Sequence, residues 1–117
     1  MTTAEEYRTA STTLYDQAMV ELDADDTRQA SEKLWGASAQ ALKSLAERRG
    51  WRHGSHGEFY RSMRRLRPEF ENPDTMESRF DAATQLHVNF YEDWLSNDEI
   101  RRRAVHVQAF VENLARL

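Results

Sequence analysis

A long run of good helix formers, Ser31–Gly50, constrains the fold of this chain more than any other stretch. Within it, apolar residues recur at helical spacing and share one face: Leu34, Ala37, Ala41 and Leu45. Further apolar residues widen that face beyond the seam of a coiled coil, as expected for a helix with more than one neighbour. Gly50 is suited to end the helix in the left-handed conformation. The stretch therefore predicts a helix around which the other helices pack.

The rest of the chain also reads at helical period, and capping residues mark where helices begin. Only two prolines and four glycines occur in 117 residues. Capping side chains followed three residues later by Glu or Gln, or directly by proline, occur at Thr3, Asp26, Ser55, Asn72 and Ser96. These signals predict helices over about Ala4–Leu22, Thr27–Arg49, His56–Leu66, Pro73–Leu95 and Asn97–Ala115. We therefore expect an all-α fold, a five-helix up-and-down antiparallel bundle forming one domain over residues 1–117.

Apolar stripes predict which side of each helix faces the core. In the fourth helix the stripe comprises Met76, Phe80, Ala83, His87, Phe90 and Trp94. In the last helix it comprises Ile100, Ala104, Val107, Val111 and Leu114. A lone histidine on such a stripe is usually a hydrogen-bonded core residue, and this is our interpretation of His87.

The composition excludes several classes of protein. No apolar run approaches the roughly 18 residues of a membrane span, and the first residues lack the apolar segment of a signal peptide. The chain has no cysteine, so it has neither disulfides nor thiolate metal sites. No glycine-rich phosphate loop and no set of metal ligands is recognisable. We expect a cytoplasmic protein without a metal, a cofactor or a membrane partner.

The net charge of −4 conceals blocks of opposite sign. Residues 31–67 hold nine basic and three acidic residues, whereas residues 68–100 hold nine acidic residues and one basic residue. The acidic total argues against a protein that coats DNA. Two interpretations stay open: the opposite blocks pack beside one another, within a chain or across a dimer, or a local basic surface binds phosphate.

The last helix opens with IRRRAVH, which offers candidate catalytic residues. Arg101 and His106 are five positions apart and so lie about 140° apart around a helix, while Arg102 lies one turn before the histidine. Histidine can transfer a proton when a 2′-hydroxyl attacks a phosphate, and arginine can stabilise the developing charge. Arg101, Arg102 and His106 are therefore the candidate residues for metal-independent RNA cleavage. The alternative is a surface arginine run with one histidine at the edge of the core.

The segment around the loop GWRHGSHG supplies the candidate binding residues: Arg49, Arg52, His53 and His56. The two histidines have H-x-x-H spacing, but a metal ion would need further ligands from elsewhere in the chain. We therefore interpret this segment as a solvated or anion-binding loop.

Two segments resemble a known family. Residues 30–51, ASEKLWGASAQALKSLAERRGW, resemble the second-helix region of the PaREP-type family of small helical archaeal and bacterial proteins, and residues 86–95, LHVNFYEDWL, resemble its fourth-helix segment. That family is similar to the HEPN superfamily, whose helical bundles commonly dimerise and are often ribonuclease toxins paired with a nucleotidyltransferase-like antitoxin. The resemblance implies that Arg101 and His106 correspond to the R-x4-6-H signature, although Arg102 stands where Asn is frequent.

Two functions follow from these observations. The first is a HEPN-like, non-catalytic homodimeric interaction module, which the apolar patterning and the acidic total favour. The alternative is a metal-independent ribonuclease or RNA-binding protein of the toxin–antitoxin type, with its R-x4-H motif at a dimer cleft. The expected partners are a second copy of the chain and, for the alternative, RNA or a nucleotide and an antitoxin-like protein. An exposed His106 near an arginine and a two-fold axis favours the ribonuclease, whereas a His106 packed against Phe110 favours the module.

Overall fold

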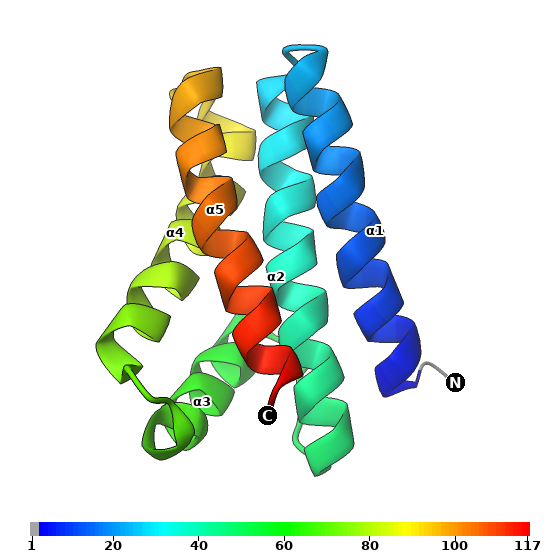
Figure 1. The fold of residues 1–117 in the computed structure, drawn as a ribbon, viewed down its shortest axis with the longest axis vertical. Coiled ribbons are helices and arrows are strands. Elements are labelled where there is room, and N and C mark those ends of the chain that lie inside the picture. The colour runs from blue at the N-terminus through cyan, green and yellow to red at the C-terminus, as the bar shows by residue number, and fades with distance from the viewer. Residues whose placement is uncertain (1–2) are drawn as a thin grey trace.

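The computed structural model describes residues 3–117, which form five α-helices and one short 3-10 helix (Figure 1). The elements are α1 (Ala4–Asp23), α2 (Thr27–Arg49), α3 (His56–Leu66), η1 (Arg67–Glu69), α4 (Pro73–Glu92) and α5 (Asn97–Ala115). Residues 3–117 contain no strand, and the predicted all-α fold is confirmed. None of the helices in this range is long and apolar enough to span a membrane.

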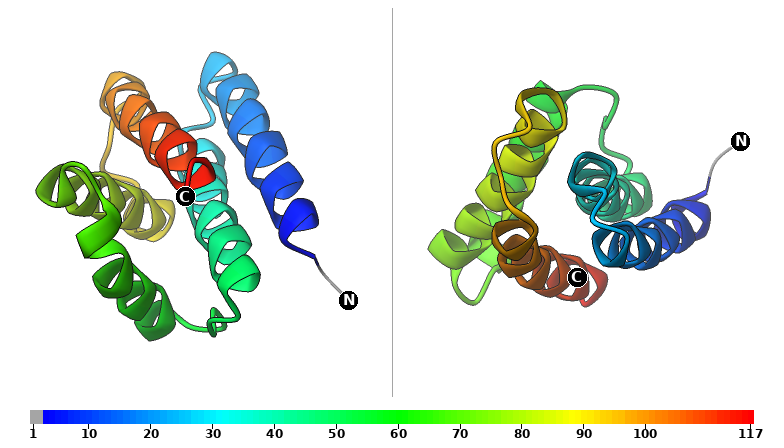
Figure 2. Two further views of the ribbon diagram at one scale, coloured as in Figure 1. Left: turned by 60° about the horizontal axis from the view of Figure 1, so that its bottom comes forward. Right: turned by 90° about the horizontal axis from the view of Figure 1, so that it is seen from above.

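Helix α2 is the centre of the arrangement, as its sequence predicts. It packs against α1, α4 and α5, and twelve of its residues are buried. The four long helices run up and down the molecule, while the short α3 lies across one end (Figure 1). Seen from above, α1 and α4 lie on opposite sides of the molecule (Figure 2). The α1–α2 turn and the α4–α5 connection therefore lie at one end, and the α2–α3 loop lies at the other (Figure 1).

All five predicted N-caps are present. The residues whose side chains accept a hydrogen bond from a first-turn N–H are Thr3, Asp26, Ser55, Asn72 and Ser96. At Ser96 the bond is reciprocal, because Glu99 accepts a hydrogen bond from the Ser96 N–H in a complete capping box. Gly50 ends α2 in the left-handed conformation, with φ of 71°. These caps explain why the helix starts could be predicted, since each satisfies an N–H that the helix itself leaves unpaired.

The end of α4 differs from the prediction. The helix stops at Glu92 and not at Leu95, because Asp93 adopts the left-handed conformation with φ of 54°. The side-chain oxygen of buried Asn89 accepts hydrogen bonds from the N–H groups of Trp94 and Leu95, at 2.9 and 2.8 Å. These bonds turn the chain out of the helix one turn early.

The inward stripe of α4 consequently shifts in its second half. Met76, Phe80 and Ala83 are buried as predicted, but the next buried residues are Leu86 and Asn89. His87 and Phe90 are only half-buried, and the prediction that Trp94 faces the core is wrong, since it is 57% exposed. The reason is that the Asn89 amide turns toward α2, where it donates to the Ser31 hydroxyl at 2.7 Å. In α5, Phe110 is fully buried where the prediction placed Val111, which is half-buried.

Candidate functional site

Helix α5 carries the three candidate catalytic residues, of which Arg101 is bonded to α1 while Arg102 and His106 are exposed. The guanidinium group of Arg101 donates to Asp23 Oδ1 at 3.0 Å and to Asn97 Oδ1 at 2.7 Å. These bonds hold it against the end of α1. Arg102 and His106 are both exposed, one turn apart. Arg101 and His106 therefore do not converge within one chain, whereas Arg102 and His106 share a solvent-facing side of the helix.

The neighbouring arginine of α5 is also engaged by the protein. Arg103 donates to Gln85 Oε1 of α4 at 3.1 Å and to the Glu99 carbonyl at 3.1 Å. Hydrogen bonds from the Ser96 backbone and side chain lower the pKa of the Glu99 carboxyl group. Arg101 and Arg103 thus fasten α5 to its neighbours, whereas Arg102 is exposed and forms no ion pair with the described residues.

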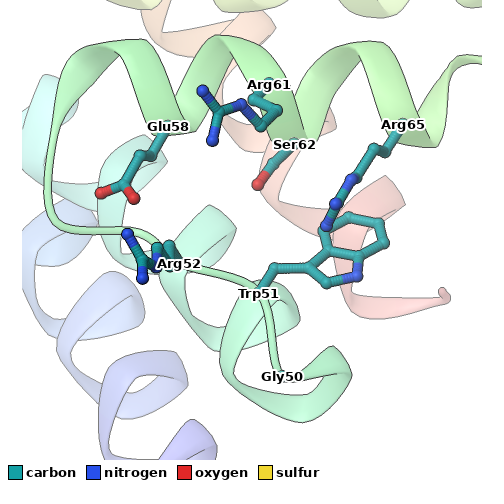
Figure 3. A pocket seen from close by; sticks show the side chains of 7 residues that line it. All are labelled: Gly50, Trp51, Arg52, Glu58, Arg61, Ser62 and Arg65. Carbon is teal, nitrogen blue, oxygen red and sulfur yellow. The ribbon is translucent and has the colours of Figure 1, made fainter.

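A pocket of about 260 Å³ lies between the α2–α3 loop and α3 (Figure 3). The residues that line it are Gly50, Trp51, Arg52, Glu58, Arg61, Ser62 and Arg65. Arg61 and Arg65 are one turn apart on the same side of α3, and Arg52 reaches the pocket from the loop. The Ser62 hydroxyl points into the space between the helix and the loop (Figure 3). Three guanidinium groups and one carboxylate therefore surround this pocket.

Trp51 forms one wall of the pocket and is held by two arginines. The guanidinium carbon of Arg65 lies 5.1 Å from the indole centroid, and that of Arg49 lies 5.4 Å from it. Arg49 also donates to both carboxylate oxygens of Glu69, at 2.6 and 2.7 Å. This hydrogen bonding lowers the pKa of Glu69 and raises that of Arg49. Arg49 therefore joins the end of α2 to η1 through Glu69 and packs against the Trp51 indole.

The other two candidate binding residues do not line the pocket. His53 Nε2 lies 2.7 Å from Glu47 Oε2, and its ring meets that of Tyr7 edge-on at 5.3 Å. The His56 ring lies 5.3 Å from the centroid of Trp35. Of the four candidates in this segment, only Arg52 borders the pocket directly, and Arg49 supports its wall.

A second cluster surrounds His87, and sequence spacing did not predict it. His87 Nδ1 lies 3.0 Å from Glu32 Oε2, and the rings of Trp35, His56 and Tyr91 lie 5.3, 5.3 and 5.7 Å from the imidazole. His87 is hydrogen-bonded, as we interpreted it, but at the edge of the core. Within residues 3–117, no three potential metal-ligating side chains come together. The cluster therefore ties α2, α3 and α4 together at the surface.

An open groove of about 860 Å³ runs between the first half of α1 and the end of α5. The two buried serines on its walls are already used, since Ser11 donates to the Ala37 carbonyl at 2.6 Å and Ser44 to the Ala4 carbonyl at 2.7 Å. Its remaining lining mixes polar residues of α1 with apolar residues at the end of α5.

Exposed apolar side chains gather at the end of α4. Tyr91 is 68% exposed, Trp94 57% and Val88 43%. Val88 and Tyr91 are one turn apart on the helix, and Trp94 follows just beyond its end. Of the twelve aromatic residues, all within the part of the chain that the structure describes, only Tyr60 is also exposed. Two of the three exposed aromatic side chains among residues 3–117 therefore lie at the end of α4.

Residues that sequence reasoning did not assign to a site include Trp51, Arg61 and Arg65. The arginines of α3 are exposed. The signal that could have found the pocket is the i, i+4 spacing of Arg61 and Arg65, opposite a loop that contains Trp51 and Arg52.

Comparison with known proteins gives one match. Residues 6–111 match the family model described as the archaeal PaREP1/PaREP8 family. No curated protein and no solved structure matches the chain.

Proposed function

The chain belongs to the archaeal PaREP1/PaREP8 family, and from this premise we propose that it is a non-catalytic helical module that forms a homodimer. The observation that supports this proposal best is the exposure of Tyr91 and Trp94 at the end of α4. In this proposal the protein acts in the cytoplasm. We expect self-association because the sequence resemblance implies similarity to the HEPN superfamily, whose members commonly dimerise.

The end of α4 has the chemistry of a dimer interface. Tyrosine and tryptophan are enriched in protein interfaces, because they bury a large apolar area with few rotatable bonds. A two-fold axis beside Tyr91 would bring the same patch of a second copy onto it, so that Val88, Tyr91 and Trp94 are covered in both chains. Single exposed apolar residues elsewhere need no such cover.

The contacts of Arg101 support a module more than an enzyme. Its guanidinium group is engaged by Asp23 and Asn97, and using it on a phosphate would first require breaking these bonds. In this proposal Arg101 stabilises the fold.

The test measures the molar mass of the purified chain by light scattering and sedimentation over a range of concentrations. We expect a dimer for the natural sequence and a monomer for the double variant Tyr91→Ser/Trp94→Ser. Val20→Ser is the control, because Val20 is 67% exposed and lies on a different helix, α1. A natural chain that stays monomeric, or a dimer that the double variant leaves intact, would contradict the proposal.

A second candidate function is metal-independent RNA cleavage, favoured by one observation, the exposure of His106 with Arg102 one turn before it. In this alternative the imidazole transfers the proton of the attacking 2′-hydroxyl and Arg102 stabilises the phosphate, with Arg101 contributing once released from Asp23. Two such sets would meet in a dimer cleft, and an antitoxin-like protein would hold the enzyme inactive.

RNA incubated with the chain in EDTA tests this alternative. Cleavage that disappears in His106→Ala but persists in His53→Ala would support it, since His53 is bound to Glu47. Absence of cleavage, or equal cleavage by both variants, would exclude the assignment to His106.

A further inference from the structure

Like most arginines among residues 3–117, the three that line the loop–α3 pocket form no ion pair, but these three border one cavity. Arg49, Arg67 and Arg101 each form an ion pair with a carboxylate. Among residues 3–117, Arg52, Arg61 and Arg65 form none. Their positive charge is therefore not compensated by the protein at short range, although all three border one pocket.

The one carboxylate on the pocket wall is already used by the loop. Glu58 Oε1 accepts a hydrogen bond from the Gly54 N–H at 2.9 Å, which fixes the turn that leads into α3. Glu58 also stands in the first turn of α3, and its N–H donates to the Ser55 hydroxyl at 3.2 Å. The carboxylate thus shapes the loop, and the guanidinium groups of Arg61 and Arg65 keep their donors for another acceptor.

The remaining walls fit a small oxyanion. Guanidinium groups bind phosphate oxygens through paired, charge-assisted N–H donors, and a hydroxyl such as that of Ser62 adds a further donor. The pocket, at about 260 Å³, lies just below the roughly 300 Å³ at which sites for drug-sized ligands begin. The positive lining and the small volume of the pocket fit a phosphate group and not a large apolar ligand.

We propose that the pocket between the α2–α3 loop and α3 binds a phosphate group through Arg52, Arg61 and Arg65, with the Ser62 hydroxyl as a further donor. Trp51 supports Arg65 from beneath, because the guanidinium stacks on its ring at 5.1 Å. The phosphate belongs either to a small phosphate monoester or to the backbone of single-stranded RNA. This site goes beyond the proposed dimer function, since it lies away from the exposed end of α4 (Figure 1).

The experiment measures binding of inorganic phosphate, a ribonucleoside 5′-monophosphate and a short single-stranded RNA to the full chain by calorimetry at low salt. We expect binding of at least one probe, weakened about tenfold by Arg61→Ala or Arg65→Ala, which is the usual worth of one charge-assisted contact. Arg64→Ala is the matched control: it removes the same charge from the same helix, but Arg64 is outside the pocket. It should change the affinity less than about twofold.

The probes also identify the source of the phosphate. Binding of the monophosphate without RNA binding indicates a small ester, whereas much tighter RNA binding indicates the backbone, with a salt slope that falls by about one for each arginine removed. No binding of any probe, or equal weakening by Arg64→Ala and Arg61→Ala, would overturn the proposal. Circular dichroism of each variant checks that the helices persist, and because the readout is binding, it is separate from the molar-mass test of dimerisation.

Discussion

The two ends of the bundle differ in what some of their arginines contact. Where α4 leads into α5, Asn89 bonds three protein groups and Arg101 bonds Asp23 and Asn97. Where α2 leads into α3, Arg52 and Arg61 border a pocket without a carboxylate partner among residues 3–117. The comparison teaches that a recognisable motif and an available functional group are different things. Arg101, which the motif identifies, is ion-paired, whereas Arg52 and Arg61, which lie outside the motif, form no ion pair with the described residues.

The charge blocks of the sequence explain this difference. Arg101 lies beside the acidic end of α1, while Arg49 and Arg67 reach carboxylates of the acidic block that follows. Opposite blocks therefore do pack beside one another in part. Within the basic block 31–67, however, Glu47 faces His53 and Glu58 caps the loop, so few acidic groups remain for the pocket arginines.

The largest expected effect is on the free energy of unfolding and concerns the α4–α5 connection. Asn89→Ala removes the acceptor of the Trp94 and Leu95 N–H groups and the donor to Ser31. Because these groups are partly or fully buried, we expect the free energy of unfolding to fall by about 2–4 kcal/mol in urea titrations followed by circular dichroism.

Ser78→Ala, at an exposed position of the same helix, is the control for Asn89→Ala. It should change the free energy of unfolding by less than about 0.5 kcal/mol. Equal losses of unfolding free energy in the two variants would mean that the Asn89 hydrogen bonds do not stabilise the connection between α4 and α5.

Helix positions were predictable because their causes are local. Each N-cap is a side chain bonding an N–H three residues away, and Gly50 ends α2 through its own backbone freedom. The end of α4 was not predictable in this way. The Asn89 oxygen accepts hydrogen bonds from the nearby Trp94 and Leu95 N–H groups, but its amide also donates to Ser31, 58 residues earlier, which no local spacing reveals.

The candidate sites were less predictable for the same reason. The sequence predicted a binding role for Arg52 from its loop, but Arg61 and Arg65 of α3 also line the pocket. That α3 packs opposite this loop is visible only in the tertiary structure. The opposite error is possible with a motif. R-x4-H spacing identifies Arg101 and His106, yet the partner of Arg101 is Asp23, 78 residues away.

A smaller effect should separate the arginines at the start of α5. Arg101→Ala removes an ion pair whose members are 43% and 76% exposed, so we expect a loss of about 0.5 kcal/mol in the free energy of unfolding. A double-mutant cycle with Asp23→Ala should return a coupling of similar size, measured by urea titration. Arg102→Ala should leave stability unchanged, and a coupling of zero between Arg101 and Asp23 would remove the structural role assigned to Arg101.

The smallest expected effect is a pH dependence at the pocket end. Hydrogen bonding to Arg49 lowers the pKa of Glu69 from its ordinary value of 4.5. A carboxyl group with a lowered folded-state pKa adds stability that is complete above its unfolded pKa and is lost as the pH falls through the folded value.

Glu69→Gln should therefore lower the urea midpoint at neutral pH, and the difference from the natural chain should shrink below about pH 4.5. Glu71→Gln is the control. Glu71 lies two residues after Glu69, and its exposed side chain forms no ion pair with the described residues. Arg49 also contacts Trp51, so Glu69→Gln tests the pocket as well. If the Arg49–Glu69 pair positions the indole, this variant should weaken phosphate binding slightly at neutral pH. It should do so even though it makes the surroundings of the pocket more positive. Stronger binding would instead mean that charge alone, and not the placement of the indole, governs the pocket.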